Sequence, residues 1–296
     1  MKKAVITGAT GFLGYALVRE LIQNGIYVYA LCRRGSSRIS RLQALGGIKV
    51  IEADFNSASH IEEAEGSDVF YHLAWEGGRN DFDAQYRNVA LSVNCLKLAS
   101  NLGCRRFICT GSQAEYGHVA GAITEETPLN PTTAYGACKA AAYYLTADLA
   151  KRLDIEHTWA RVFSVYGPND NQNTLIMMLI RDLTSKGEAR LDTDGKQIWN
   201  YLHESDAARA LRLLGNVNSS NTVYNVASRD SKPLKEFVEI LRGEISETAA
   251  IHYGSVKSPV NLNVDVGKLI GSIGEYECNR FSEFTNNYAM GEVCVD

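Results

Sequence analysis

The sequence lacks the features that mark several classes of protein. No apolar run approaches the ~20 residues that a helix needs to span a bilayer, so we expect no membrane segment. Only 5 residues are proline, and with 45% hydrophobic and 22% charged residues the composition is that of a globular protein rather than a disordered or fibrous one. Basic residues do not exceed acidic ones, because 30 Lys and Arg face 34 Asp and Glu. The resulting net charge of −4 disfavours nucleic acid as a partner.

The seven cysteines form no recognisable disulfide or metal pattern. They are scattered, odd in number and without a CxxC pair, so we expect a reduced, cytoplasmic protein with no disulfide and no metal site. The opening residues 1–17 place two lysines before an apolar run, as a signal peptide does. Three glycines interrupt that run and no cleavage motif follows, so we expect a first strand and its turn instead.

Short apolar runs rich in β-branched residues alternate with helical patterns. The expected strands cover residues 4–7, 26–31, 49–52, 69–73, 106–110 and 158–165. Between the first two, residues 14–23 place four apolar side chains at helical spacing and end at the stop signal Asn24-Gly25. This alternation predicts an α/β fold with a parallel, doubly wound sheet.

The pattern becomes less regular after residues 166–168, Tyr-Gly-Pro. Helical segments are expected near 175–186, 204–214 and 234–242, with Asn-, Ser- and Gly-rich loops between them. We therefore predict a first domain over residues 1–167 and a smaller, mixed lobe over 168–296. Segments near 197–228 are candidates to pack back on the first domain, and the tail after Phe284 receives no assignment.

A glycine-rich turn follows the first expected strand and opens the first helix. Its glycines permit a tight turn and close approach of backbone to a pyrophosphate, while the helix N-terminus supplies N–H donors. The spacing Gly-x-x-Gly-x-x-Gly differs from the standard Gly-x-Gly-x-x-Gly, and a simple strand-to-helix turn is the alternative. Its place in the first βα unit favours a dinucleotide. The predicted contacts are Gly8, Thr10, Gly11, Phe12, Leu13 and Gly14.

The choice of dinucleotide is expected at the end of the second strand, where a carboxylate would bind the adenosine ribose of NAD. Residues 31–38 contain no carboxylate, and the guanidinium groups of Arg33 and Arg34 suit a 2′-phosphate. We therefore predict NADP, with NAD as the alternative cofactor and a solvated basic loop as the alternative interpretation. Asp54 and Phe55, just after the third strand, are expected to meet the adenine, although Asp54 also suits a simple turn. The wider basic cluster comprises Arg33, Arg34, Arg38 and Arg41.

Tyr135 and Lys139 begin an alanine-rich helix expected to run to about Arg152. Residues four apart share a helical face, so the phenol and the ammonium point into one pocket. There the cation favours the phenolate, which exchanges a proton with a substrate oxygen. The Tyr-x-x-x-Lys spacing recurs at Tyr253 and Lys257, between a glycine and a proline, where we interpret it as coincidence.

An apolar strand over residues 107–112 ends in the hydroxyl of Ser112. The carboxyl ends of parallel strands face the ligand crevice, so Ser112 is expected where a substrate carbonyl is polarised. Taken singly, Ser112 suits a helix cap or turn equally well. Together with the glycine turn and the helical Tyr135 and Lys139, it predicts an active site.

These segments resemble the extended short-chain dehydrogenases/reductases, also called the NAD-dependent epimerase/dehydratase family. The matching segments are TGATGFLG at 7–14, DF at 54–55, HLAW at 72–75, NV at 88–89, GSQAEYG at 111–117, YGACK at 135–139, RVFSVYGP at 161–168 and, more weakly, WNYLHESDAARA at 199–210. The resemblance implies a Rossmann domain that binds NAD(P) and a C-terminal lobe that binds a nucleotide-activated sugar. It also implies a homodimer, with the helices near 88–102 and 136–152 at the interface.

The resemblance assigns Ser112, Tyr135 and Lys139 as the catalytic triad, with Tyr135 as the acid/base. The cofactor contacts that it adds are Leu73, Ala74, Trp75, Thr110, Phe163 and Val165, besides Tyr135 and Lys139 themselves. The substrate contacts that it implies are Trp75, Asn88, Ser112, Gln113, Ser164, Asn173, Thr174, Leu175 and Trp199.

Departures from the family pattern narrow the activity. Dehydratases of the family carry Thr-Asp-Glu where residues 112–114 are Ser-Gln-Ala, so dehydration is not expected. Where the family usually has Arg-Asp-aromatic, residues 199–201 are Trp-Asn-Tyr, and Ser164 replaces the customary Asn of the Tyr-Gly-Pro segment. These two changes leave the identity of the sugar and of the nucleotide base open.

Three functional interpretations remain. The arginine pair favours an NADPH-dependent reductase of a 4-keto sugar nucleotide, with Tyr135 as proton donor. An NAD-dependent sugar-nucleotide 4-epimerase is the second interpretation. A nonenzymatic redox sensor that binds NADP is the third.

Overall fold

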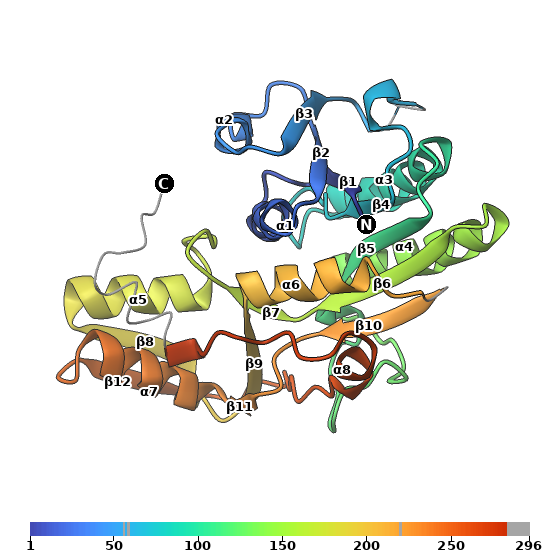
Figure 1. Cartoon of the computed structure of the whole chain (residues 1–296). Helices are drawn as coiled ribbons and strands as arrows, with labels where there is room; N and C mark the ends of the chain where they lie inside the picture. Colours follow the sequence, from blue (N-terminus) through green and yellow to red (C-terminus); the bar gives the residue numbers. More distant parts are fainter. Residues whose placement is uncertain (56, 58–59, 219–220, 283–296) are drawn as a thin grey trace.

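The computed structural model describes residues 1–55, 57, 60–218 and 221–282. Its centre is a parallel sheet of seven strands in the order β10-β6-β5-β4-β1-β2-β3 (Figure 1). The strands are β1 (Lys3–Thr7), β2 (Tyr27–Cys32), β3 (Ile48–Glu52), β4 (Val69–His72), β5 (Arg106–Ser112), β6 (Glu156–Val162) and β10 (Thr222–Val226). The strand order reverses at β1, which lies between β2 and β4, so the crevice at their carboxyl ends is the expected ligand position. The predicted doubly wound α/β fold of Rossmann type is confirmed.

Helices cover both faces of this sheet, which explains why its strands are apolar on both sides. Along β1, Ala4 and Ile6 belong to the same core cluster as residues of α1 (Phe12–Gln23) and α6 (Glu204–Leu214), whereas Val5 belongs to the cluster that includes residues of α3 (Phe82–Asn101) and α4 (Ala134–Arg152). Small buried residues such as Ala142 let α4 lie close to the sheet. Both faces of the sheet are therefore buried, as parallel sheets require.

One expected strand proves to be two, and the prediction of a single strand over 158–165 is wrong. β6 ends at Val162, the backbone N–H of Phe163 bonds Val226 O at 3.0 Å, and β7 (Ser164–Tyr166) pairs with β9 (Ile198–His203) in another sheet. The apolar pattern does not reveal the break, because both strands lie in apolar surroundings and only their distant partners differ.

The remaining elements form a second group at the lower left of Figure 1. They are α5 (Leu175–Lys186), β8 (Glu188–Thr193), β11 (Ser231–Pro233), α7 (Leu234–Ile245) and β12 (Ala250–Val256), with small sheets β11-β9-β7 and β12-β8. The expected helices at 175–186 and 204–214 are confirmed, and the third extends to Ile245. α6 and β10 come from the second half of the sequence yet pack on α1 and complete the central sheet. The division of the chain at residue 167 stays a prediction.

Four short helices complete the described part: α2 (Ile39–Gln43), α8 (Gly267–Ile273) and the one-turn 3-10 helices η1 (Glu62–Ala64) and η2 (Gln113–Glu115). No helix within the described ranges combines the length and the apolar character needed to cross a membrane. Six cysteines in these ranges are unbridged, and the seventh, Cys294, lies outside the described residues with the tail after Phe284.

Candidate active site

A cavity of about 470 Å³ opens at the carboxyl ends of the central strands. Residues from the glycine turn, from β4 to β6, from α4 and from the start of α5 surround it. The predicted site residues that line it are Phe12, Leu13, Leu73, Trp75, Thr110, Ser112, Gln113, Tyr135, Lys139, Phe163, Ser164, Val165, Thr174, Leu175 and Trp199. The structure thus brings the three residues of the predicted triad into one cavity, and residues from both halves of the sequence form its walls.

Tyr135 and Lys139 reach the cavity from the first turns of α4. Thr133 caps this helix, since its hydroxyl accepts a hydrogen bond from the N–H of Gly136 at 3.1 Å. The Lys139 ammonium is buried, donates to the Thr110 carbonyl at 2.6 Å and lies 3.7 Å from the centre of the Trp75 ring. A carbonyl and an aromatic face stabilise this buried charge, so the ammonium is held in place beside the chamber.

Ser112 ends β5 and is only 5% exposed. It caps η2: its Oγ accepts from the N–H of Ala114 at 3.2 Å, and its own N–H donates to Glu115 Oε1 at 2.7 Å. The structure therefore gives Ser112 the cap geometry that was the alternative to a catalytic role, and it also places Ser112 in the cavity wall. The hydroxyl proton is not used by the cap, because Oγ acts there as acceptor.

The glycine turn has the close contacts that explain its composition. Gly8 has a φ of +77°, and a Cβ there would lie 2.6 Å from the Ala74 nitrogen. At Gly14, a Cβ would lie 2.0 Å from the Gly8 carbonyl oxygen. Gly8 therefore needs both its left-handed conformation and its lack of a side chain, while Gly14 lies behind the turn and lets α1 pack against it. Gly14 does not line the catalytic cavity.

A neutral histidine supports this turn from below. His72 ends β4, with Nδ1 2.8 Å from the Thr7 hydroxyl and Nε2 3.0 Å from the Ser92 hydroxyl. Burial, with the nearby Lys139 charge, lowers the pKa of His72 to about 3. The ring is therefore uncharged at neutral pH and serves as a hydrogen-bonded spacer between β1, β4 and α3.

A second cavity, of about 200 Å³, adjoins the first, because Leu73 and Trp75 line both. Its predicted residues are Gly8, Thr10, Gly11, Arg33, Phe55, Leu73, Ala74 and Trp75. Ser36, Arg38 and Glu76 also line it but were not predicted as contacts, although Arg38 belongs to the basic cluster. Arg33 Nη1 lies 3.1 Å from Glu76 Oε2, so a carboxylate and a guanidinium face each other at this end.

Arg34 and Asp54 do not line this second cavity, contrary to the sequence prediction. Both line a separate surface hollow with Glu52, and Asp54 Oδ2 accepts from the Ser57 hydroxyl at 2.9 Å. Successive side chains diverge in the turn after β2, so Arg33 faces the cavity and Arg34 faces away. Arg41 is also elsewhere: it bonds Asn169 and lies over the Tyr15 ring.

Asn88 and Asn173, two predicted substrate contacts, do not line the catalytic cavity. Asn88 is 1% exposed and binds the Glu76 backbone, accepting from its N–H at 2.9 Å and donating to its carbonyl at 3.0 Å. Gln85, one turn earlier on α3, accepts from the Trp75 indole at 2.7 Å. These amides hold the loop after β4 in shape. The Asn173 N–H donates to the Asn171 side chain at 2.9 Å in the loop before α5.

Six residues in the cavity wall were missed, and three of them have polar or charged side chains: Arg79, Asp170 and Tyr201. The Arg79 guanidinium lies 5.2 Å from the centre of the Tyr135 ring, and no ion pair joins Arg79 within the described residues. Asp170 accepts from the Thr174 hydroxyl at 2.9 Å and the Asn171 N–H at 2.7 Å, and burial raises its pKa to about 6. Arg79 and Asp170 lie on loops without a motif. Only Gly77 and Gly78, which mark a loop at the strand end, gave a signal for Arg79.

The second Tyr-x-x-x-Lys match lies away from both cavities. Tyr253 belongs to β12, and its hydroxyl donates to Glu239 Oε1 at 2.9 Å. Lys257 follows the same strand. Neither side chain lines the catalytic cavity.

Comparison with known proteins places this geometry in context. A model described as the NAD dependent epimerase/dehydratase family matches residues 4–227. The dTDP-6-deoxy-L-talose 4-dehydrogenase (NAD(+)) of Aggregatibacter actinomycetemcomitans is 25% identical over 79% of this chain and 87% of its own length. The UDP-glucose 4-epimerase of Corynebacterium glutamicum is 25% identical over 81% of this chain and 79% of its own length. The solved structure of MoeE5 in complex with UDP-glucose and NAD is 27% identical, covers 96% of each chain and has a TM-score of 0.81.

Proposed function

This chain belongs to the NAD dependent epimerase/dehydratase family, and from that premise we propose that it reduces a 4-keto sugar nucleotide with NADPH. The main support is that Ser112, Tyr135 and Lys139 line one cavity that adjoins a pocket containing Arg33 and Arg38. In this proposal residues 1–167 bind the cofactor and residues 168–296 complete the sugar site.

The residues present fit a dinucleotide. The turn at Gly8 and Gly11 forms a cradle beside Ala74 that a side chain on Gly8 would fill, and the N-terminus of α1 follows it. Phe55 and Leu31 give the adjoining pocket apolar walls for an adenine. Arg33 and Arg38 supply charge for a 2′-phosphate, with the Ser36 hydroxyl as a further donor. These residues would hold the cofactor, which supplies a hydride when bound.

In the proposed reaction, side chains of the protein protonate and stabilise the C4 oxygen of the sugar. The Tyr135 phenol donates its proton to the C4 oxygen as that oxygen gains negative charge, and the Ser112 hydroxyl donates a hydrogen bond to it. The fixed Lys139 ammonium favours the phenolate left behind. One C=O becomes CH–OH, with one hydride and one proton consumed. Arg79, at the same cavity and near Tyr135, is the cation that we assign to the diphosphate of the substrate.

An NAD-dependent 4-epimerase is the second candidate, and one observation favours it. The Glu76 carboxylate lines the adenosine-side pocket beside Arg33, where it is placed to accept hydrogen bonds from ribose hydroxyls. The family includes NAD-binding proteins, and the C. glutamicum relative is named as a 4-epimerase.

Two probe reactions separate these functions. In the reverse direction, the reductase should oxidise dTDP-6-deoxy-L-talose, a sugar nucleotide with a C4 hydroxyl, while reducing NADP⁺ at the same rate, as followed by nicotinamide absorbance. The epimerase should instead convert UDP-glucose to its C4 epimer with no net change in nicotinamide absorbance. Net reduction of NADP⁺ supports the first proposal, whereas epimer formation by protein that copurifies with NAD⁺ replaces it with the second.

We also propose a homodimer formed through α3 and α4. These neighbouring helices expose four large apolar side chains: Phe82 at 67%, Tyr86 at 69%, Tyr144 at 61% and Leu145 at 52%. Such a patch is typical of a subunit interface.

Charging this patch should abolish the dimer. Tyr86→Glu combined with Leu145→Glu is expected to halve the molar mass measured by light scattering, because burial of two unpaired carboxylates opposes association. Val256→Glu, on another exposed apolar residue, is the matched control and should leave the mass unchanged. A monomeric wild-type protein, or a dimer that tolerates both charges, contradicts this interface.

A further inference from the structure

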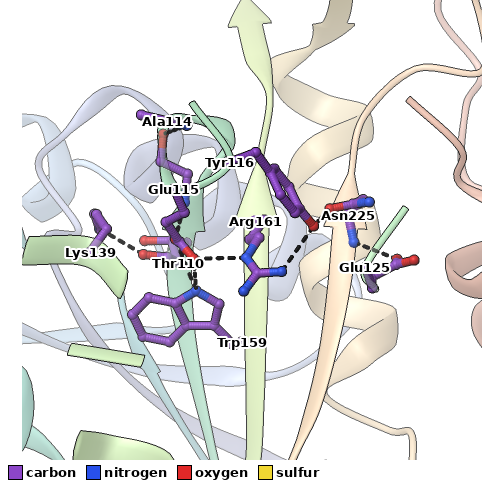
Figure 2. Close-up of polar contacts among 10 residues, drawn as sticks. Thr110, Ala114, Glu115, Tyr116, Glu125, Lys139, Trp159, Arg161 and Asn225 are labelled. Carbon is purple, nitrogen blue, oxygen red and sulfur yellow. Dashed lines mark hydrogen bonds and ion pairs between the residues drawn. The ribbon is translucent and has the colours of Figure 1, made fainter. Parts of the chain in front are cut away.

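A fully buried carboxylate, Glu115, lies directly behind Ser112 without lining the catalytic cavity. Its Oε1 accepts from the Ser112 N–H at 2.7 Å. The Trp159 indole N–H lies 3.0 and 3.1 Å from its two oxygens, and Arg161 Nε donates to Oε2 at 2.7 Å (Figure 2). The carboxylate therefore joins Ser112, the last residue of β5, to Trp159 and Arg161, which lie two positions apart on one face of β6.

The charge of Glu115 is neutralised in the interior by Arg161, which is 2% exposed. Arg161 also donates from Nη1 to the Tyr116 hydroxyl at 2.9 Å, and that hydroxyl donates to Asn225 Oδ1 at 2.7 Å. Figure 2 shows this chain of contacts running from the end of β5 across β6 to β10. The position of the carboxylate is thus fixed by three strands of the sheet and not by the short turn η2 alone.

The same turn also contacts the helix that supplies the phenol. A Cβ on Gly136 would lie 2.3 Å from the Ala114 carbonyl oxygen, so the first turn of α4 packs directly on η2. Gly136 follows Tyr135 in the sequence, and Ser112 precedes η2. The segment that Glu115 holds therefore lies between the proposed proton donor and the proposed hydrogen-bond donor of the reaction.

Stability alone is a poor reason for a buried ion pair at this place. Moving two charged groups from water into a protein interior costs several kcal/mol per ion. Apolar residues of similar volume often stabilise a core equally well. An ion pair with directed hydrogen bonds does fix geometry, and reaction rates are sensitive to misplacements of about 1 Å. Glu115 and Arg161 form such directed hydrogen bonds, and the same Glu115 carboxylate accepts a hydrogen bond from the Ser112 N–H.

We propose that Glu115, held by Arg161, is a positioning residue that sets the placement of Ser112 and of the first turn of α4 for the reaction. This inference rests on the proposed function, because it gives Glu115 a role only through Ser112 and Tyr135. Glu115 itself touches neither substrate nor cofactor.

The first test is Glu115→Gln, which keeps the size of the side chain but replaces one acceptor oxygen by an NH2 donor. With dTDP-6-deoxy-L-talose and NADP⁺ as probes, kcat is expected to fall about 10–100-fold, the effect of a small misplacement, while KM stays within about twofold. Should this variant not fold, Glu115→Gln combined with Arg161→Gln removes both buried charges and gives the same readouts.

Glu125→Gln is the matched control at the other end of the same network. The Glu125 carboxylate accepts from the Asn225 N–H at 2.8 Å (Figure 2), and among the described residues it makes no hydrogen bond to η2. It should leave kcat within about twofold of the wild type. An equal loss of kcat in both variants would mean that the network serves general folding, and would overturn the inference.

A double-mutant cycle separates this inference from the proposed function. If Glu115 acts through Ser112, then Glu115→Gln should slow Ser112→Ala by a smaller factor than it slows the wild type, and the remaining loss is the part that acts through Tyr135. Full turnover by Ser112→Ala contradicts the proposed function. Impaired turnover by Ser112→Ala with normal turnover by Glu115→Gln contradicts only the positioning role.

Crystal structures of the two Gln variants provide a readout that needs no turnover. The Ser112 side chain and the contact between Ala114 and Gly136 should shift in Glu115→Gln and stay unchanged in Glu125→Gln. An unchanged Ser112 in Glu115→Gln overturns the inference.

Discussion

Replacing Tyr135 with phenylalanine is expected to lower turnover by about 10²–10⁴-fold, the usual contribution of a positioned acid or base. The substitution removes only the phenolic oxygen, and with it the proton for the C4 oxygen of the sugar. The ring keeps its edge-on contact with Trp75, whose ring centre lies 6.1 Å away, so the cavity wall is preserved. Affinity for NADPH should therefore stay within about twofold of the wild type. Steady-state kinetics and a fluorescence titration measure the two quantities.

Tyr144→Phe is the matched control for this variant. Tyr144 lies on the same helix, is 61% exposed and is not among the residues that line the cavity. It should leave both turnover and cofactor affinity unchanged. Unchanged turnover in Tyr135→Phe would contradict the role of Tyr135 as the acid.

Those parts of the fold that depend on local pattern could be predicted from the sequence. The first five expected strands and the helices at α1, α4, α5 and α6 follow from hydrophobic period, caps and stop residues, all of which are local. The division between β6 and β7 could not be predicted in this way. At Phe163 the backbone turns to a new partner, and the partner β9 lies about thirty residues away in the sequence.

The candidate site shows the same limit. Tyr135, Lys139 and Ser112 occupy one cavity because helical spacing and the strand end fix where each side chain points. Arg34 and Asn88 do not line the two cavities, because their direction depends on a turn and on a loop whose shape the sequence does not reveal. Asn88, for example, binds the Glu76 backbone, a contact that exists only once α3 has packed under the loop.

Arg33 and Arg38 are the residues whose loss should most change the choice of cofactor. Arg33→Ala combined with Arg38→Ala is expected to weaken NADPH binding about 10²-fold, because two charge-assisted contacts to a 2′-phosphate are removed. NADH lacks that phosphate, so its affinity should change by no more than about twofold. Parallel titrations with NADPH and NADH measure both affinities.

Arg34→Ala is the control that separates the structure from the sequence pattern. The sequence pairs Arg34 with Arg33, whereas the structure places Arg34 in the hollow beside Asp54 and Glu52. Its removal should therefore leave the preference for NADPH over NADH intact, apart from the weak long-range effect of one surface charge. A loss in Arg34→Ala as large as in the double variant would show that the turn after β2 rearranges when the cofactor binds.

The opposite preference would give Glu76 the decisive role. If the wild-type protein binds NADH as well as NADPH and tolerates the loss of Arg33 and Arg38, then the Glu76 carboxylate, which lies 3.1 Å from Arg33, binds the ribose without needing either arginine. Glu76→Gln should in that case lower the affinity for NADH, since a carboxylate accepts hydrogen bonds from ribose hydroxyls more strongly than an amide does. Under the NADPH proposal the same substitution should strengthen NADPH binding, because Glu76 and the phosphate compete for Arg33. The sign of this single change therefore distinguishes the two cofactors.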